Sequence, residues 1–442
     1  MKHFFCLLLT LAAFLACSDD DSFSTSPSER LTFTTDTLRM DTVFAGVGSS
    51  TYTFWVYNET GKGLRLNTVR LLNGNQTGFR VNVDGSYLDN SLGAVVSDLE
   101  VRKGDSLRVF VELTAPDTRQ LEPQLVSDDL VFQLESGVEQ RVRLEAWAWD
   151  AQKVTDLVIS RDTVIASATP ILLYGNGLRV DSGAVLTLRG TTLFFHDGAG
   201  IDVYGQLRME DCLLRGDRLD HMFDYLPYDR ISGQWRGLWF APSSSGNELT
   251  NTEIRNAQTA VYLTDSAVVD TTQLRLQMTR CIVHNAKGHG VVSNNSYIVL
   301  DHCQLTNTLG DCLAVCGGRC DISHCTLAQF YPFSADRGAA LRFYDGGGLT
   351  LTCSYTIVTG YETDVLMGEQ TDSASLFSYV FTDCLLRTPV VEDDTLSFRK
   401  IIWETPKDSI QGGGHFVLFD EKNLNYDFHL DSLSTAQGLG CY

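Results

Sequence analysis

Apolar and polar side chains alternate in short, well-separated runs between residues 30 and 150. Tyr52, Phe54 and Val56 share one face of such a run, and alternate residues of 107–113 and 142–146 do the same. Side chains two positions apart on a strand share a face, so each run predicts a strand with one buried face. Several such strands separated by Asn and Gly turns predict an immunoglobulin-type β-sandwich, here without any cysteine.

From residue 151 onward a different pattern repeats along the chain. Cys281, Cys303 and Cys325 recur at steps of 22 and 22, and the same slot continues at Tyr355 and Cys384 at steps of 30 and 29. Apolar residues form parallel series in which position 276 matches 298 and 320, and position 278 matches 300 and 322. Short strands that recur every ~22 residues predict a solenoid whose coils stack as parallel strands.

This repeat resembles the right-handed parallel β-helix of pectate-lyase-like proteins over roughly residues 155 to 440. The closing segments 426–430 and 434–438 are similar to the ends of many bacterial chains of this kind. At ~25 residues per coil, the domain would hold on the order of eleven coils. The sequence therefore predicts an all-β protein, with an immunoglobulin-like β-sandwich over residues 30–150 and a right-handed parallel β-helix over residues 151–442.

The first residues predict where the protein is sent. A short basic start precedes thirteen mostly apolar residues, 4–16, which are too few to span a bilayer and are typical of a secretory signal. Ala16 directly before Cys17 resembles a bacterial lipoprotein signal, which implies removal of residues 1–16 and acylation of Cys17. The acidic run 19–21 resembles the surface-export signal of Bacteroidetes-type lipoproteins, with residues 17–29 as an acidic tether. The alternative is an ordinary signal peptide followed by a plain solvated tether.

The acidic excess of the chain disfavours some classes of binding partner. The chain carries 34 Lys and Arg against 55 Asp and Glu, a net charge of −21. Nucleic acid and anionic membrane surfaces require a cationic patch, so neither is expected as the main partner. The acidic excess is general, with net charges of −9 over residues 18–150 and −13 over residues 151–442. The expected membrane contact is the lipid on Cys17, which implies an outer-membrane location facing the cell exterior.

Ten cysteines remain besides Cys6 and Cys17, and all ten lie in the repeat domain. Because several occupy repeat slots, the sequence favours a buried ladder of small, polarisable side chains. Cys312, Cys316 and Cys320 recur at steps of four, but they fall in different slots of one coil, which disfavours a shared metal ion. The alternative is one or two disulfides, for instance between Cys316 and Cys320.

The resemblance to pectate-lyase-like proteins implies polysaccharide-lyase or glycosidase chemistry as the enzymatic alternative. Residues 310–312, Gly-Asp-Cys, resemble the Asp-Asp-Cys segment of polygalacturonases, and residues 288–290 resemble their Gly-His-Gly, but the order is reversed and the other motifs are missing. Lyase chemistry needs calcium held by carboxylates and a basic residue, for which Lys287 is the candidate. The favoured interpretation of Asp311, His289 and Lys287 is that they occupy turns between strands and have no catalytic role. No catalytic set, metal or cofactor is therefore expected, and calcium belongs only to the lyase alternative.

Two segments interrupt the repeat, residues 215–240 and 328–345, and both combine aromatic residues with Asp and Arg. Aromatic faces stack on the CH surfaces of sugars, and charged side chains bind hydroxyls, so loops of this composition suit a sugar-binding groove. Loop packing through salt bridges is the competing interpretation. The candidate ligand-binding residues are Tyr225, Tyr228, Asp229, Arg230, Tyr331, Asp336 and Arg337.

These patterns favour a lipid-anchored surface protein with a non-catalytic binding or structural role. Its partner would be a polysaccharide or a surface protein that contacts the β-helix. The alternative is a carbohydrate-active enzyme of the pectate-lyase-like class, either a polysaccharide lyase or a glycoside hydrolase. An inverting hydrolase needs two carboxyl groups across the scissile bond, and the sequence supplies no convincing pair.

Overall fold

The structure is a computed structural model that describes residues 22–265 and 272–442. The signal segment, Cys17 and the acidic run 19–21 lie outside the described residues. The chain forms two compact units, Met1–Asp150 and Ala151–Tyr442.

Two sheets pack together in the first unit. One has the strand order β1-β4-β9-β6-β7, and the other has the order β2-β11-β10-β5-β8 with β3 also beside β11. Most neighbours are antiparallel, whereas β2 and β3 run parallel to β11. The elements are β1 (Thr32–Phe33), β2 (Thr37–Arg39), β3 (Val43–Phe44), β4 (Tyr52–Tyr57), β5 (Leu64–Leu71), β6 (Phe79–Val83), β7 (Ser86–Tyr87), η1 (Asn90–Leu92), β8 (Val95–Val101), β9 (Ser106–Leu113), β10 (Gln124–Leu134) and β11 (Glu139–Trp149).

The alternating runs build the core of this β-sandwich. Phe54 and Val56 of β4 and Leu144 of β11 are buried in one hydrophobic cluster, while Trp55 and Tyr57 between and beside them are exposed. This is the period-2 burial expected of a strand with one face on the core. The predicted β-sandwich is confirmed.

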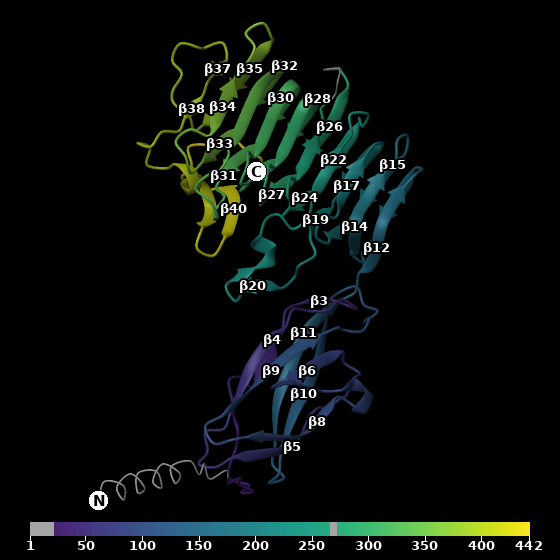
Figure 1. Ribbon diagram of the computed structural model, residues 1–442. Coiled ribbons are helices and arrows are strands. Elements are labelled where there is room, and N and C mark those ends of the chain that lie inside the picture. The colour runs from purple at the N-terminus through teal and green to yellow at the C-terminus, as the bar shows by residue number, and fades with distance from the viewer. Residues whose placement is uncertain (1–21, 266–271) are drawn as a thin grey trace, which may run out of the picture. The chain divides into compact units, whose positions relative to one another are not determined.

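The second unit is a solenoid whose coils contribute strands to three faces, and equivalent strands stack in parallel from coil to coil (Figure 1). The face that carries the groove is called the groove face. It consists of the first halves of β12 (Gln152–Ile159) and β14 (Ile171–Val180), then β16 (Thr192–Phe195), β19 (Leu213–Gly216), β24 (Glu253–Arg255), β27 (Ile282–His284), β29 (Gln304–Thr306), β31 (Thr326–Gln329), β33 (Ile357–Gly360), β36 (Leu385–Leu386) and β38 (Ile402–Trp403).

The remaining strands form the other two faces. The second face contains β17 (Gly200–Val203), β22 (Gly237–Phe240), β25 (Val261–Leu263) and β34 (Leu366–Glu369). The third contains β13 (Thr163–Ala166), β15 (Val185–Arg189), β18 (Gln206–Glu210), β23 (Asn247–Thr250), β26 (Leu274–Thr279), β35 (Phe377–Thr382) and β37 (Phe398–Arg399). The long strands β28 (Val291–Asp301), β30 (Leu313–Ser323) and β32 (Leu341–Ser354) pass from the second face to the third.

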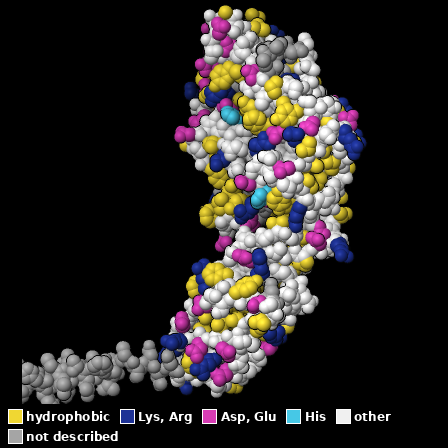
Figure 2. All heavy atoms as spheres, turned by 45° about the vertical axis from the view of Figure 1, so that its right-hand side comes forward, with side chains coloured by type: hydrophobic (Ala, Val, Ile, Leu, Met, Phe, Trp, Pro, Cys, Tyr) yellow, Lys and Arg dark blue, Asp and Glu magenta, His cyan; other side chains and the backbone are white. Residues whose placement is uncertain are grey.

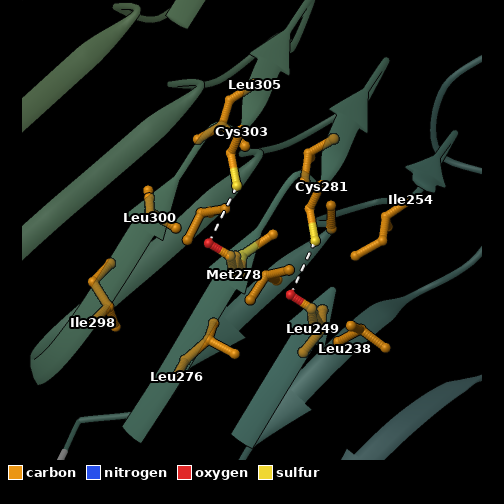
Figure 3. Close-up of a cluster of buried hydrophobic side chains, with 14 of the residues drawn as sticks. Leu238, Leu249, Ile254, Leu276, Met278, Cys281, Ile298, Leu300, Cys303 and Leu305 are labelled. Carbon is orange, nitrogen blue, oxygen red and sulfur yellow. Dashed lines mark hydrogen bonds between the residues drawn. The ribbon is translucent and has the colours of Figure 1, made fainter. Parts of the chain in front are cut away.

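The predicted coil register is confirmed over most of the repeat. Ile282 pairs with Gln304 and Gln304 with Thr326, which places the preceding cysteines in one slot. The series 276/298/320 and 278/300/322 also pair as predicted. The inward side chains of these strands form one continuous hydrophobic core (Figure 3).

One coil departs from the predicted register by one residue. Thr356, not Tyr355, occupies the cysteine slot, and Tyr355 takes the left-handed turn position before it, with φ of 50°. The apolar residue Ile357 suggested an inward position, but it lies on the outer side, buried by the C-terminal segment at Ala436 and Leu439. Burial of a strand from both sides removes the alternation that fixes register.

The ten cysteines in the described part of the chain are free thiols. In the cysteine slot, each thiol donates to a backbone carbonyl inside the core, as Cys281 does to Leu249 (3.3 Å) and Cys303 to Met278 (3.4 Å) (Figure 3). Burial raises the pKa of the Cys312 thiol to about 12. The thiols therefore act as small core side chains, as the ladder interpretation predicts.

The C-terminal segment folds back over the groove face. It contains η3 (Gly412–His415) and an antiparallel hairpin of β39 (Phe416–Asp420) and β40 (Asn425–Leu430). Phe416 and Phe428 pack on Phe330 just beyond β31, and the N–H of Gly440 donates to the Tyr355 carbonyl (2.9 Å). In Figure 1 the hairpin lies beside β31, and it forms one wall of the groove.

Acidic and basic side chains both occur on the surface, although the acidic ones outnumber the basic ones in the chain, 55 to 34. On the face shown in Figure 2, acidic and basic side chains are interspersed. Arg65 and Glu100 form an exposed pair (2.9 Å) on two neighbouring strands, and Arg319 and Asp321 form a half-buried one (2.8 Å). Such pairs contribute little to stability, so the acidic excess is mainly a property of the solvated surface.

Candidate functional site

A groove of about 630 Å³ lies on the groove face of the solenoid. One wall comes from the insertion after β19, which contains β20 (His221–Phe223), β21 (Leu226–Pro227) and η2 (Tyr228–Arg230), and another from the C-terminal hairpin. The lining residues are Asp229, Arg230, Glu253, Arg255, Ile282, His284, Asn285, Gln304, Asn307, Pro332, Phe333, Leu418, Leu424, Asn425, Tyr426, Asp427, Phe428, His429 and Tyr442.

Two rows of outward side chains cross the floor of the groove. Because β24, β27 and β29 pair in register, the rows are Glu253, Ile282, Gln304 and Arg255, His284, Thr306. The residue between the rows on each strand is fully buried in the core. The coil repeat thus sets these side chains at the strand spacing of ~4.8 Å.

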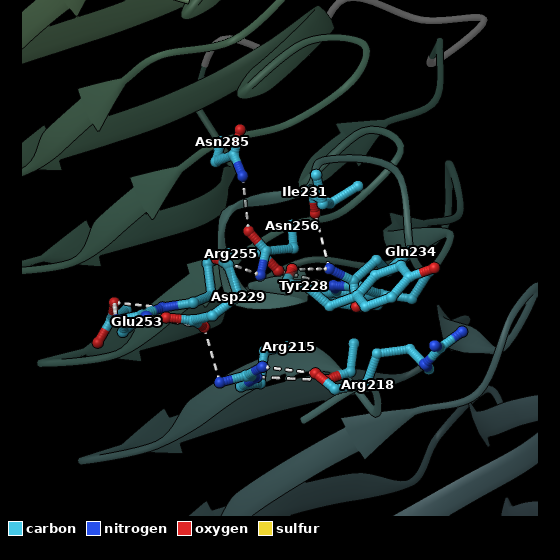
Figure 4. A network of polar contacts seen from close by, with 12 residues as sticks. Arg215, Arg218, Tyr228, Asp229, Ile231, Gln234, Glu253, Arg255, Asn256 and Asn285 are labelled. Carbon is cyan, nitrogen blue, oxygen red and sulfur yellow. Dashed lines mark hydrogen bonds and ion pairs between the residues drawn. The ribbon is translucent and has the colours of Figure 1, made fainter. Parts of the chain in front are cut away.

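A row of asparagines follows the floor strands at the next turn. Asn256, Asn285 and Asn307 all have left-handed backbones, with φ of 63°, 60° and 56°, which asparagine tolerates better than most residues. Asn285 Nδ2 donates to Asn256 Oδ1 (2.8 Å), and Asn256 Nδ2 donates to the Asp229 carbonyl (3.0 Å) (Figure 4). This ladder fastens the insertion to the coils.

Two arginines hold the Asp229 carboxylate at the floor. Arg215 Nη1 lies 2.7 Å from Asp229 Oδ1, and Arg255 Nη1 lies 3.0 Å from Oδ2 (Figure 4). Arg255 also donates to Glu253 through Nε (2.7 Å). Burial lowers the pKa of Arg215, and the Asp229 charge opposes that shift. The Asp229 and Glu253 carboxylates are therefore both paired with arginines of the protein.

His284 is held in the middle of the floor by a chain of hydrogen bonds. The Tyr442 hydroxyl donates to Gln304 Oε1 (2.7 Å), Gln304 Nε2 donates to Thr306 Oγ1 (3.0 Å), and Thr306 Oγ1 lies 2.8 Å from His284 Nδ1. Burial, together with the charge of Arg255, lowers the pKa of His284 to about 4. The imidazole is therefore neutral near pH 7. If the Thr306 hydroxyl donates to Nδ1, the N–H of the ring stands at Nε2.

Aromatic side chains of the hairpin face this floor. The Tyr426 and Phe428 rings lie 6.2 Å and 6.4 Å from the His284 ring, centroid to centroid. Asp427 Oδ1 lies 2.6 Å from His429 Nδ1, and these contacts with His429 lower the pKa of Asp427. The groove thus joins an aromatic wall to a polar floor.

The first interruption of the repeat supplies two of the predicted ligand-binding residues to the groove. Asp229 and Arg230 line it, and Asp229 does so while held in the arginine network. The Tyr228 ring is covered by the Arg218 guanidinium at 3.9 Å. Tyr225 is 78% exposed and stacks on a neighbouring ring outside the groove lining.

The second interruption contributes neighbours of the predicted residues rather than the residues themselves. Tyr331 is buried with its hydroxyl 2.8 Å from Ser232 Oγ, and Arg337 lies over the Tyr361 ring at 4.5 Å. Asp336 is exposed. Pro332 and Phe333 are the residues of this segment that line the groove. Loop packing therefore describes Tyr331 and Arg337 better than ligand contact.

The weak catalytic candidates Asp311, His289 and Lys287 are not among the residues that line the groove. Asp311 Oδ1 accepts hydrogen bonds from the Ala339 N–H (2.7 Å) and Arg342 Nε (2.9 Å), and His289 Nδ1 lies 3.4 Å from Oδ2. Although burial raises it, these contacts hold the pKa of Asp311 below its usual value. Asp311 therefore stabilises a turn through these hydrogen bonds. The Lys287 side chain is exposed.

We expect Asp311→Asn to lower the free energy of unfolding by about 1–3 kcal/mol at pH 7, because buried donors lose a charged acceptor. A carboxyl whose folded pKa is depressed stabilises the fold above its unfolded pKa, and this contribution is lost as pH falls through the folded value. The difference from wild type should thus shrink toward pH 3 in urea unfolding. The exposed variant Asp336→Asn should change stability by less than about 0.5 kcal/mol, and an equal loss in both variants would contradict the role of Asp311.

Two further clusters resemble chemical sites. Asp301, His302 and His324 lie close together, but the two imidazoles are stacked within 4° of parallel at 4.7 Å. A histidine binds a metal along the in-plane lone pair of its nitrogen, so parallel stacked rings cannot both address one ion. His302 and His324 instead occupy equivalent turn positions of successive coils, where their rings stack.

The second cluster joins Glu404, His415 and Ser434. His415 Nδ1 lies 2.9 Å from Ser434 Oγ, and His415 Nε2 lies 3.6 Å from Glu404 Oε2. His415 is 0% and Ser434 5% exposed, and none of the three residues lines the groove. It fastens the C-terminal segment to the last coils.

Several groove residues were not singled out from the sequence, among them Glu253, Arg255, Asn307 and Tyr426. The asparagines at 256, 285 and 307 recur at steps of 29 and 22, in register with the strand repeat. That recurrence is a signal for a turn ladder beside the floor. The hairpin residues show no such recurrence, so the sequence does not predict that the hairpin lies over the floor of the groove.

Comparison with known families agrees with this architecture. Residues 152–327 match the family described as "Right handed beta helix region". The repeat domain is a right-handed parallel β-helix. The match covers less than half of the chain and includes the floor strands β24, β27 and β29 of the groove, whereas the hairpin lies beyond it.

Comparisons over the whole chain give low similarity. No curated protein sequence matches it. Among solved structures, the periplasmic alginate epimerase AlgG is 10% identical (54% of this chain, 77% of that chain, TM-score 0.26). The family 28 exopolygalacturonase of Yersinia enterocolitica is 9% identical (79% and 81%, TM-score 0.26), and PapD-like domain 7 of human CEP192 is 13% identical (29% and 92%, TM-score 0.20). These scores are too low to support an argument about function.

Within residues 22–265 and 272–442, no helix has the length and apolar character needed to cross a bilayer.

Proposed function

We propose that this chain is a lipid-anchored surface protein that binds a glycan in the β-helix groove without cleaving it. The observation that carries the proposal is that each carboxylate of the groove lining already has a partner in the protein: Asp229 has Arg215 and Arg255, Glu253 has Arg255, and Asp427 has the His429 imidazole. Glycoside hydrolysis needs a carboxyl group free to give and take a proton at the glycosidic bond. Paired carboxylates favour binding over catalysis.

The other groove residues support a sugar as the ligand. Phe333, Tyr426 and Phe428 offer aromatic surface, and the amides of Asn285 and Asn307 offer hydrogen bonds of both directions. Aromatic rings with a few placed polar groups are the usual lining of a small-ligand site, and 630 Å³ is in the range of such sites. A rigid coil stack below a folded-back hairpin keeps this lining preorganised.

A glycan array probed with the full chain tests the proposal, with product release measured on the same glycans. We expect binding of at least one glycan class and no new reducing ends or unsaturated products. Turnover would overturn the non-catalytic role and favour the lyase or hydrolase alternative. Capture of a surface protein with no glycan bound would replace the glycan by a protein partner.

The anchor predicts a clear effect of Cys17→Ala. If Cys17 carries the lipid, the variant should move from the membrane fraction to the soluble fraction and lose incorporation of labelled palmitate, since acyl chains supply the membrane affinity. Replacing residues Asp19 to Asp21 by Ala should keep the label and reduce the protein accessible to protease on intact cells. A Cys17→Ala protein that stays labelled in the membrane fraction would contradict the lipoprotein assignment.

A further inference from the structure

Three neutral polar groups of the groove have no hydrogen-bond partner among the residues that the structure describes. They are the side-chain amide of Asn307, the hydroxyl of Tyr426 and Nε2 of His284. Asn307 is 1% exposed, and both its Oδ1 and its Nδ2 are buried. Buried polar groups are nearly always hydrogen-bonded in folded proteins, so the buried Asn307 amide and Tyr426 hydroxyl at one groove call for a partner from outside the chain.

The asparagine ladder makes Asn307 the sharpest of these exceptions. The equivalent amides one and two coils earlier are used, by the bonds of Asn285 to Asn256 and of Asn256 to the Asp229 carbonyl. The left-handed backbone at position 307 explains why an asparagine stands there. It does not explain why the series of amide bonds stops at this coil, where the side chain borders the groove.

We propose that these three groups bind a neutral sugar, with the Asn307 amide pairing with two hydroxyls on adjacent ring carbons. This inference rests on the proposed glycan-binding function and names the class of glycan. A side-chain amide places an acceptor oxygen next to an N–H donor, and each hydroxyl of a vicinal diol both donates and accepts. The two pairs are therefore complementary, while the His284 ring and the Tyr426 hydroxyl supply further uncharged contacts.

The charges of the groove favour an uncharged ligand. Asp229, Glu253 and Asp427 are already paired, and the Arg230 guanidinium is held by the Asn423 carbonyl. The net charge of −21 further opposes a polyanionic chain. An acidic sugar would have to compete for arginines that the protein uses to hold its own loop.

The test uses the full chain and two sets of tetrasaccharides in calorimetric titrations. One set contains neutral glucose, mannose, galactose, xylose and arabinose oligomers, and the other contains oligogalacturonate and oligoalginate. We expect a neutral oligomer to bind and its periodate-oxidised form, which lacks vicinal diols, to lose binding. Tyr426→Phe and Asn307→Ala should each weaken binding at least tenfold.

The same variants separate a ligand role from a structural one. Because the removed hydroxyl has no internal partner, the thermal midpoint should stay unchanged or rise in Tyr426→Phe while affinity falls. Asn307→Ala should lower the midpoint modestly, since alanine is strained in the left-handed backbone at this position. Tyr331→Phe is the matched control, since it removes a buried hydroxyl that contacts Ser232 (2.8 Å). It should lower the thermal midpoint and keep the affinity.

Three outcomes of these titrations would contradict different parts of the proposal. Binding of the acidic oligomers in place of the neutral ones would overturn the neutral class while glycan binding stands. Neutral binding that both variants leave intact would overturn the assignment of Asn307 and Tyr426. No binding of any glycan, here and on the array, would overturn the proposed function itself and this inference with it.

Discussion

Replacing Glu404 by glutamine is expected to lower the free energy of unfolding of the β-helix by about 3–5 kcal/mol. The Glu404 side chain is 1% exposed and is paired with Arg387, whose side chain is 8% exposed. It also accepts hydrogen bonds from the Thr359 hydroxyl (2.7 Å) and the Gly412 N–H. Glutamine keeps the shape of the side chain but leaves the Arg387 charge buried without its counter-charge, which is far costlier than losing an exposed pair.

Urea unfolding followed by far-ultraviolet circular dichroism measures this effect. The matched control is Glu100→Gln, which breaks the exposed pair with Arg65 (2.9 Å, side chains 45% and 47% exposed) and should cost less than about 1 kcal/mol. The double variant Arg387→Met/Glu404→Leu should recover most of the loss, since no buried charge remains unpaired. Equal losses for Glu404→Gln and Glu100→Gln would show that the buried pair is not what secures the C-terminal segment.

The architecture could be predicted from the sequence because it depends on local periodicity. Alternation at Phe54 and Val56 marks a strand wherever the partner strand lies, and the recurrence of Cys281, Cys303 and Cys325 reports stacking between neighbouring coils. Both signals come from residues whose burial is decided within a few strands. The register failed only at Ile357, where a second layer buries the outer side of the strand.

The groove could not be predicted in the same way. Its residues come from the insertion at Asp229, the floor strands and the hairpin at Tyr426, segments about 200 residues apart in the chain. No periodic pattern connects them, because the hairpin reaches the floor by folding back along the coils. The aromatic interruptions did indicate loops at the groove, but Asp229 and Arg230 are the members of the predicted set that line it. Composition identifies such loops, whereas tertiary packing selects the residues that meet.

Replacing Trp235 by alanine is the second change with a large expected effect, a loss of about 3–5 kcal/mol in the free energy of unfolding. Trp235 is 1% exposed, stacks on Phe195 with ring centroids 4.1 Å apart, and donates from Nε1 to the Arg255 carbonyl (2.8 Å). Its removal leaves a cavity in the core directly below the groove floor and an unpaired buried carbonyl.

The same variant links the core to the groove, because the Arg255 backbone that Trp235 supports carries the guanidinium that holds Asp229. Trp235→Ala should therefore weaken glycan binding as well as stability, and Trp235→Phe, which keeps an aromatic ring but loses the N–H donor, should have a smaller effect on both. Trp239→Ala is the matched control, since this tryptophan, four residues later in β22, is 38% exposed and stacks on Tyr262 (4.6 Å). It should cost no more than about 1.5 kcal/mol and leave affinity unchanged. Loss of stability in Trp235→Ala with full affinity retained would mean that the floor keeps its geometry without support from the core, and that the Asp229 network positions the groove by itself.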